Sequence, residues 1–182
     1  MITKQDLQKW IEEYLKDTDY ELITLNVSAE NDVLVEVDRL AGVDVDFCAE
    51  LNRFLVEKIE EFSAVSSQPS DFDYSLEVGS VSLTDPFKTK MQFEKNLGHE
   101  VEVLAKPSEV SHQPSEQWVK YHGQLVSVDE ETFSVDVEEK IKADPQPLPE
   151  GKEKKKLRPV KQIVTHTWRY DEPKYVKYDL KF

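Results

Sequence analysis

Apolar residues near the N-terminus follow the spacing of a helix. They recur at intervals of three and four positions, as Leu7, Trp10, Ile11, Tyr14 and Leu15. Residues at this spacing lie on one face of an α-helix. Thr3, followed three residues later by Asp6, resembles a capping box in which Asp replaces the usual Glu. The pattern predicts a first helix with a single apolar stripe.

The next segments alternate between apolar and polar residues, as half-buried strands do. Ile23, Leu25 and Val27 alternate with polar neighbours, and residues 33–37 repeat the pattern after the turn-prone residues 30–32. These two runs predict a hairpin with one buried face.

A second helix and a third strand complete the first half of the chain. Asp44 or Asp46 can cap the helix, and its apolar residues recur at intervals of three and four through residues 47–62. Residues 72–78 then alternate as a strand does. The order helix, strand, strand, helix, strand allows both helices to cover one side of a small sheet.

The second half begins after Pro86, because proline cannot occupy a central strand and restricts the residue before it. A short helical turn at 91–97 is expected to end at Gly98. Five apolar alternations follow, in residues 101–103, 119–125, 133–137, 163–168 and 176–182. Several short strands without a covering helix predict a small closed barrel. We expect domains at 1–86 and 87–182, with inserted loops at 106–116 and 143–156.

Charge divides the chain at the same place. Residues 1–86 hold 6 basic and 20 acidic residues, and residues 87–182 hold 17 of each, so the first domain carries the whole net charge of −14. The stretch 152–182 is locally basic, with 10 basic against 4 acidic residues. Such a split favours electrostatically steered docking on a composite surface over uniform coating of nucleic acid.

Candidate chemistry is sparse. His99, His112, His122 and His166 lack the spacing of metal ligands, and the single cysteine, Cys48, lies on the apolar stripe of the second predicted helix. No phosphate-binding glycine motif is present. We therefore expect no metal, no cofactor and no catalysis. The absence of a basic, apolar leader and of a long apolar run favours a cytoplasmic protein without a membrane span.

Three segments resemble one family in the same order and spacing. They are Gly42–Arg53 (GVDVDFCAELNR), Tyr74–Phe87 (YSLEVGSVSLTDPF), and Phe93 with Gly98, the strand 101–103 and Tyr121–Leu125 (YHGQL). They are similar to the bacterial ribosome maturation factor family RimP. The resemblance spans nearly the whole chain.

The resemblance implies an α+β fold, with an N-terminal α-β-β-α-β domain and a C-terminal Sm/SH3-like β-barrel. It also implies a monomeric, non-enzymatic factor that assembles the small (30S) ribosomal subunit. Such a factor would bind the immature subunit, and its barrel would contact small-subunit ribosomal protein twelve. Arg53, Ser80 and Pro86 match the family pattern, with Pro86 acting through the geometry between the domains.

The interdomain turn departs from the family pattern. The family commonly reads Ser-Ser-Pro-Gly-Leu-Asp-Arg-Pro, and Asp85 here stands in the place of the arginine. If that arginine touches RNA in relatives, this chain has lost the contact or moved it to Lys88 or Lys90.

A basic run supplies a second candidate for RNA contact. It comprises Lys152, Lys154, Lys155, Lys156, Arg158 and Lys161. Lysines beside phosphates release counterions without reading the base sequence. A solvated loop enriched in lysine for solubility explains the run equally well.

Two other classes of function remain open from the sequence. The chain could be a protein-interaction adaptor that pairs through an exposed strand of its barrel, with no ribosomal role. A hydrolase among the many carboxylates is a weaker alternative, because solvated helix faces explain most of them.

Overall fold

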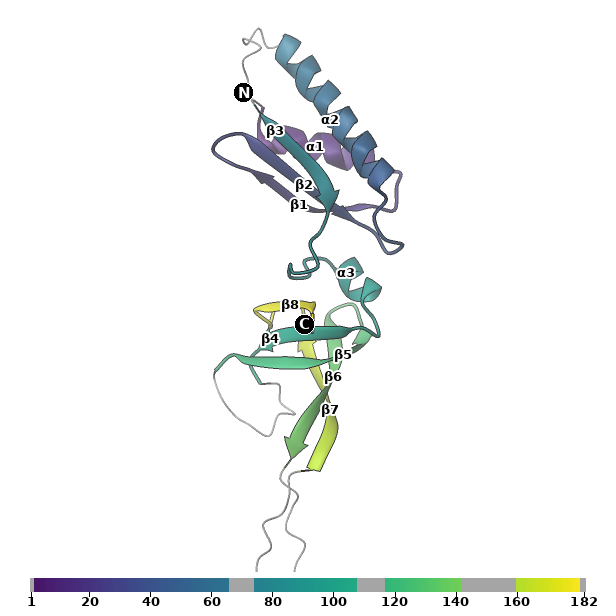
Figure 1. The fold of residues 1–182 in the computed structure, drawn as a ribbon, viewed down its shortest axis with the longest axis vertical. Coiled ribbons are helices and arrows are strands. Elements are labelled where there is room, and N and C mark those ends of the chain that lie inside the picture. Colours follow the sequence, from purple (N-terminus) through teal and green to yellow (C-terminus); the bar gives the residue numbers. More distant parts are fainter. Residues whose placement is uncertain (1, 66–73, 108–116, 142–159, 181–182) are drawn as a thin grey trace, which may run out of the picture. The chain divides into compact units, whose positions relative to one another are not determined.

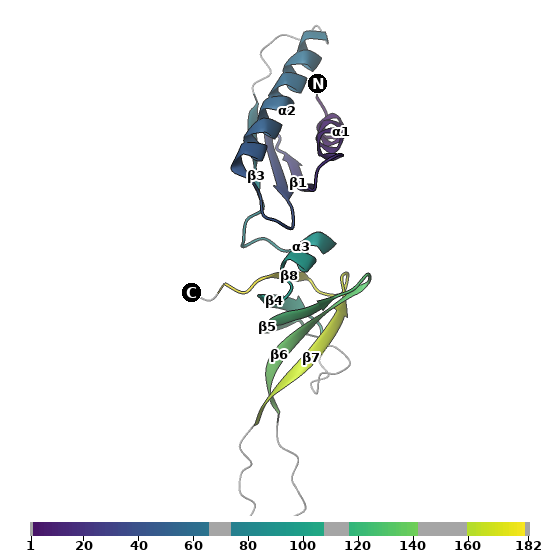
Figure 2. The same ribbon diagram turned by 90° about the vertical axis from the view of Figure 1, so that its right-hand side faces the viewer.

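A computed structural model describes residues 2–65, 74–107, 117–141 and 160–180 of the chain (Figures 1 and 2). The chain divides into two compact units, 1–95 and 96–182. The first unit holds a three-stranded sheet and the second a five-stranded sheet.

The first helix, α1 (Lys4–Leu15), begins where the capping residues predict. The backbone N–H of Asp6 donates to Thr3 Oγ1 at 3.2 Å, and the backbone N–H of Thr3 donates to Asp6 Oδ2 at 2.9 Å. Leu7, Ile11 and Leu15 are buried along one stripe. The capping box and the predicted apolar face are both confirmed.

A hairpin and a parallel strand form the first sheet. β1 (Glu21–Val27) pairs antiparallel with β2 (Asp32–Asp38), and β3 (Ser75–Ser80) pairs parallel with β2. At the hairpin turn Asn31 has a φ of 68°, a conformation that asparagine tolerates better than most residues. The strand order is β1-β2-β3.

The second helix, α2 (Val45–Val65), follows directly after Asp44. Asp44 Oδ1 accepts from the backbone N–H of Asp46 at 2.9 Å, which makes Asp44 the capping residue of the two that the sequence offered. Buried side chains of α2 join those of α1 and of the sheet in one core, which includes Ile11, Val35 and Leu55. Both helices therefore cover the same face of the sheet.

A short helix, α3 (Lys90–Lys95), follows the first sheet and lies within the first unit. Gly98 comes just after it with a φ of 84°, in the left-handed region expected of a glycine that ends a helix. The predicted short helical turn is confirmed.

The second unit is an antiparallel sheet. Its strands are β4 (Glu100–Ala105), β5 (Val119–Val128), β6 (Thr132–Ile141), β7 (Val160–Arg169) and β8 (Tyr175–Tyr178). Alternate residues of these strands, such as Val103, Leu125 and Phe133, are fully buried. The predicted periodicity of two is confirmed in β4, β5 and β6. In β7 the buried residues are His166 and Trp168, whereas Ile163 is 67% exposed, and β8 ends at Tyr178.

The closed barrel predicted for this unit is wrong for the part of the chain that the structure describes. The strand order is β7-β6-β5-β4-β8, so β7 and β8 are edge strands and do not pair with each other. β8 has only 4 residues, and all of them stand in antiparallel register with residues of β4. Apolar alternation reports that a strand has one buried face, and it does not report which edges meet.

Candidate functional site

Arg53 lies on the exposed side of α2. Its Nε donates to the carbonyl oxygen of Ala49, one turn earlier, at 3.3 Å. Glu50 and Glu57 are exposed on the same helix. Arg53 is thus an exposed cation among the carboxylates of α2.

Ser80 and Pro86 flank an exposed segment that leaves the first sheet. Ser80 is the last residue of β3 and pairs with Val37 of β2, and Pro86 is exposed. Between them the backbone N–H of Asp85 donates to the carbonyl oxygen of Ser82 at 3.1 Å, which closes a turn. Among the described residues, no hydrogen bond or ion pair joins Arg53 to Ser80 or Pro86.

The lysines that could replace the missing arginine are engaged within the first unit. Lys88 Nζ donates to Thr24 Oγ1 at 2.6 Å, and Lys90 Nζ lies 3.7 Å from Glu94 Oε1 on α3. Both lysine side chains remain exposed at this end of the unit, so either can exchange its partner for a phosphate.

Lys95, which the sequence did not single out, makes a closer ion pair. Its Nζ lies 2.6 Å from Oδ1 of Asp38, whose side chain is only 10% exposed. The backbone N–H of Arg39 donates to the same oxygen at 2.9 Å. The pair fixes α3 to the end of β2, and only the fold brings these residues together, because 57 positions separate them.

Of the basic run, Lys161 alone falls within the described residues. It is exposed on β7 and forms an ion pair with Glu138 of β6. Lys154, Lys155, Lys156 and Arg158 lie outside the described residues. The structure therefore places only the end of this run, beside a strand as expected.

A polar cluster lies on β4, β5 and β8 and was not predicted from the sequence. Glu102 Oε1 accepts from the Tyr175 hydroxyl at 2.6 Å and from Lys120 Nζ at 3.3 Å. His122 Nδ1 lies 3.2 Å from Asp179 Oδ2. The hydrogen bond from Tyr175 holds the pKa of Glu102 below its ordinary value of 4.5, and the lysines nearby act in the same direction. The cluster links three adjacent strands, which explains its place without any catalytic role.

His166 is fully buried in the second core. Its Nε2 lies 2.8 Å from Glu139 Oε1, and its ring stacks on Trp168 with centroids 5.4 Å apart. The alternation of β7 already put His166 on the same face as Trp168. This geometry is that of a hydrogen-bonded histidine in a protein core.

Two features of the described residues bear on metal and thiol chemistry. No group of three or more His, Cys, Asp or Glu among them could hold a metal ion. Cys48 is buried, and burial raises the pKa of its thiol, which disfavours the nucleophilic thiolate.

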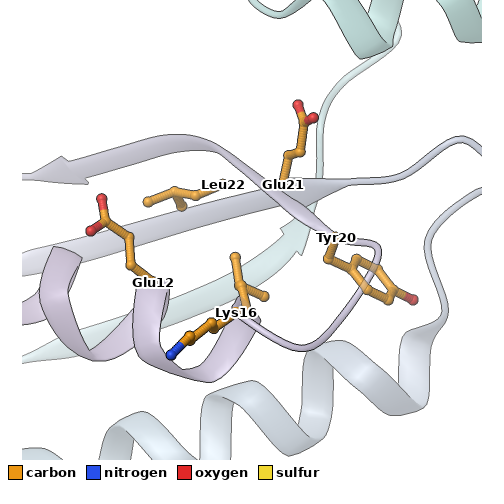
Figure 3. A pocket seen from close by; sticks show the side chains of 6 residues that line it. Glu12, Lys16, Tyr20, Glu21 and Leu22 are labelled. Carbon is orange, nitrogen blue, oxygen red and sulfur yellow. The ribbon is translucent and has the colours of Figure 1, made fainter.

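A shallow hollow of about 380 Å³ lies between the end of α1 and the start of β1 (Figure 3). Glu12, Lys16, Tyr20, Glu21 and Leu22 line it, together with Leu15. In Figure 3 the Lys16 ammonium points away from the two carboxylates. This lining has no nucleophile and no convergent set of groups, so its chemistry is that of a surface depression.

No helix in the described ranges has both the length and the apolar content needed to cross a membrane.

The fold defines a mixed α+β protein with two sheets, and the described candidate cations, Arg53 and Lys161, are exposed, as binding requires. Residues 10–83 match the family model described as the RimP N-terminal domain. Over 156 residues the chain is 28% identical to proteins named ribosome maturation factor RimP in two strains of Porphyromonas gingivalis, covering 86% of this chain and 87% of theirs. The chain is thus similar to the RimP family, through the N-terminal domain model and along most of its length in these relatives.

Proposed function

We propose that the protein is a ribosome maturation factor that binds the immature small (30S) ribosomal subunit and promotes its assembly without catalysis. The observation that carries this proposal is the similarity to ribosome maturation factors along 86% of the chain. The exposure of the two described candidate cations, Arg53 and Lys161, supports a binding role.

Two kinds of contact would hold the protein on the subunit. Arg53, Ser80, Pro86 and the basic run, with Lys154, Lys155, Lys156, Arg158 and Lys161, would contact the subunit and its rRNA. The C-terminal unit would contact small-subunit ribosomal protein twelve. The protein would act as a cytoplasmic monomer and leave once maturation hides its site.

Sedimentation of cell lysates through sucrose gradients tests the proposal. A tagged version of the full chain should migrate with free small subunits and be absent from joined ribosomes and free large subunits. Migration only at the top of the gradient, at low as well as moderate salt, would contradict the proposal.

An interaction adaptor without a ribosomal role is the second candidate. The observation that favours it is the free outer edge of β7 in the described sheet, since exposed strand edges recruit strands of other chains. Ile163 on this strand is 67% exposed. An adaptor would bind its partner equally well in extracts from which ribosomal particles have been removed.

A further inference from the structure

Helices α1 and α2 cover one face of the first sheet and leave the other open, apart from the end where Lys95 of α3 reaches Asp38. Val33, Val35 and Val37 of β2 point into the core with both helices. The alternate residues of β2 therefore point to the opposite face. On β2 these residues include Leu34 and Glu36. Leu34 is in register with Asn26 of β1 and Glu77 of β3, and Glu36 is in register with Thr24 of β1 and Gly79 of β3. We call these six residues together with Glu21 the open sheet face.

The open sheet face carries carboxylates without cationic partners. Glu21 and Glu77 are exposed and Glu36 is half-buried. Among the described residues none of the three forms an ion pair, whereas Asp38 at the end of the same face is paired with Lys95. Lys88, the cation that reaches this face, donates to Thr24.

The open sheet face places an apolar side chain between carboxylates, which suits arginine and lysine. Half-buried Leu34 stands beside Glu77 of the neighbouring strand, and Glu36 lies two residues further along β2 on the same face. The aliphatic stem of a basic side chain packs on apolar surface while its charged head reaches a carboxylate.

The same charges disfavour other occupants. Phosphates are repelled by an acidic surface, and the first 86 residues carry a net charge of −14. Across the described residues, no set of acidic groups is arranged to hold a metal ion.

We propose that the open sheet face docks an extended, arginine- and lysine-rich segment of a protein partner. This inference rests on the proposed function, because proteins that are packed among rRNA carry such segments to neutralise phosphate. It assigns the open sheet face to a basic polypeptide and leaves rRNA to the other candidate residues, among them the basic run.

Two matched pairs of substitutions in the full chain test the surface. Glu36→Gln with Glu77→Gln removes two charges from the open sheet face, and Glu57→Gln with Glu60→Gln removes two from the exposed side of α2. The probe is a fluorescent peptide of alternating arginine and glycine, measured by anisotropy at low and moderate salt. The open-face pair should weaken binding about fivefold or more, as expected for the loss of two charge pairs, and the α2 pair less than about twofold.

Each outcome decides the question. If both double variants lose the same affinity for the peptide, the effect comes from net charge alone and the proposal is overturned. The proposal is also overturned if the natural chain does not bind the peptide. A labelled single-stranded RNA serves as the second probe. If the natural chain binds this RNA more tightly than the peptide, and the open-face pair weakens that binding, the face binds nucleic acid and the proposal is overturned. Glu77→Gln alone, at an exposed position, gives the same direction if the double variant folds poorly.

Sedimentation with purified small subunits separates this inference from the proposed function. If the natural chain fails to sediment with subunits, the proposed function fails, and the peptide comparison still decides what the open sheet face binds. If it sediments and the open-face and α2 pairs behave alike, the inference fails and the proposed function stands.

Discussion

At the scale of single residues, Gly123 has the tightest surroundings of the described glycines. A Cβ built on it would lie 2.2 Å from the backbone carbonyl oxygen of Asp136. We expect Gly123→Ala to lower the free energy of unfolding by about 2–3 kcal/mol, because the backbone of β6 would have to move. Gly79→Ala is the matched control, since nothing lies within 4 Å of its Cβ position. Urea titrations of both variants check this, and similar midpoints would contradict it.

Glu102 predicts a pH dependence of stability. The Tyr175 hydroxyl lowers the pKa of Glu102 in the folded state, so the carboxylate stabilises the fold fully above its ordinary value of 4.5. This stabilisation is lost as the pH falls through the lower folded-state pKa. We expect Glu102→Gln to cost about 1–2 kcal/mol at pH 7, and the difference from the natural chain to shrink below about pH 4.

Thermal melts between acid and neutral pH measure this difference. Glu130→Gln removes the same charge at an exposed turn and should leave the curve unchanged. Tyr175→Phe removes the donor and should weaken the pH dependence as well. A constant difference between Glu102→Gln and the natural chain at every pH would contradict the assignment.

At the scale of elements, the start of α2 depends on one cap. Asp44 Oδ1 accepts from the backbone N–H of Asp46, which would otherwise lack a partner at the helix N-terminus. We expect Asp44→Ala to lower the free energy of unfolding by about 1 kcal/mol, and Asp44→Asn to cost much less because asparagine caps as well as aspartate. Denaturant titrations check the order, and equal losses in the two variants would assign the effect to charge.

At the scale of the whole molecule, the charge split predicts how binding responds to salt. Each lysine that neutralises a phosphate adds slightly less than one to the slope of log affinity against log salt. If the basic run contacts rRNA, replacing Lys154, Lys155 and Lys156 by Gln should weaken binding to small subunits and reduce that slope by about 2–3. Gradient binding at several salt concentrations measures it. An unchanged slope would leave the run as a solvated loop.

The sequence by itself determined the local elements. The capping box at Thr3, the apolar stripes of both long helices and the alternation of most strands appear where predicted, because these features depend on neighbours within a few positions. In β1 a register shift between Leu22 and Thr24 places Leu22 in the core in place of Ile23. The family resemblance was readable for the same reason, since its motifs are continuous segments such as Gly42–Arg53.

Only the tertiary structure decided which distant groups meet. The barrel prediction failed because the alternation of a strand indicates which of its faces is buried, but does not indicate which other strands pair with its edges. The Lys95–Asp38 pair, the Glu102 cluster and the open sheet face each join residues from different elements, through strand register and helix docking. Such contacts depend on the packing of the whole unit, and no short stretch of sequence contains them.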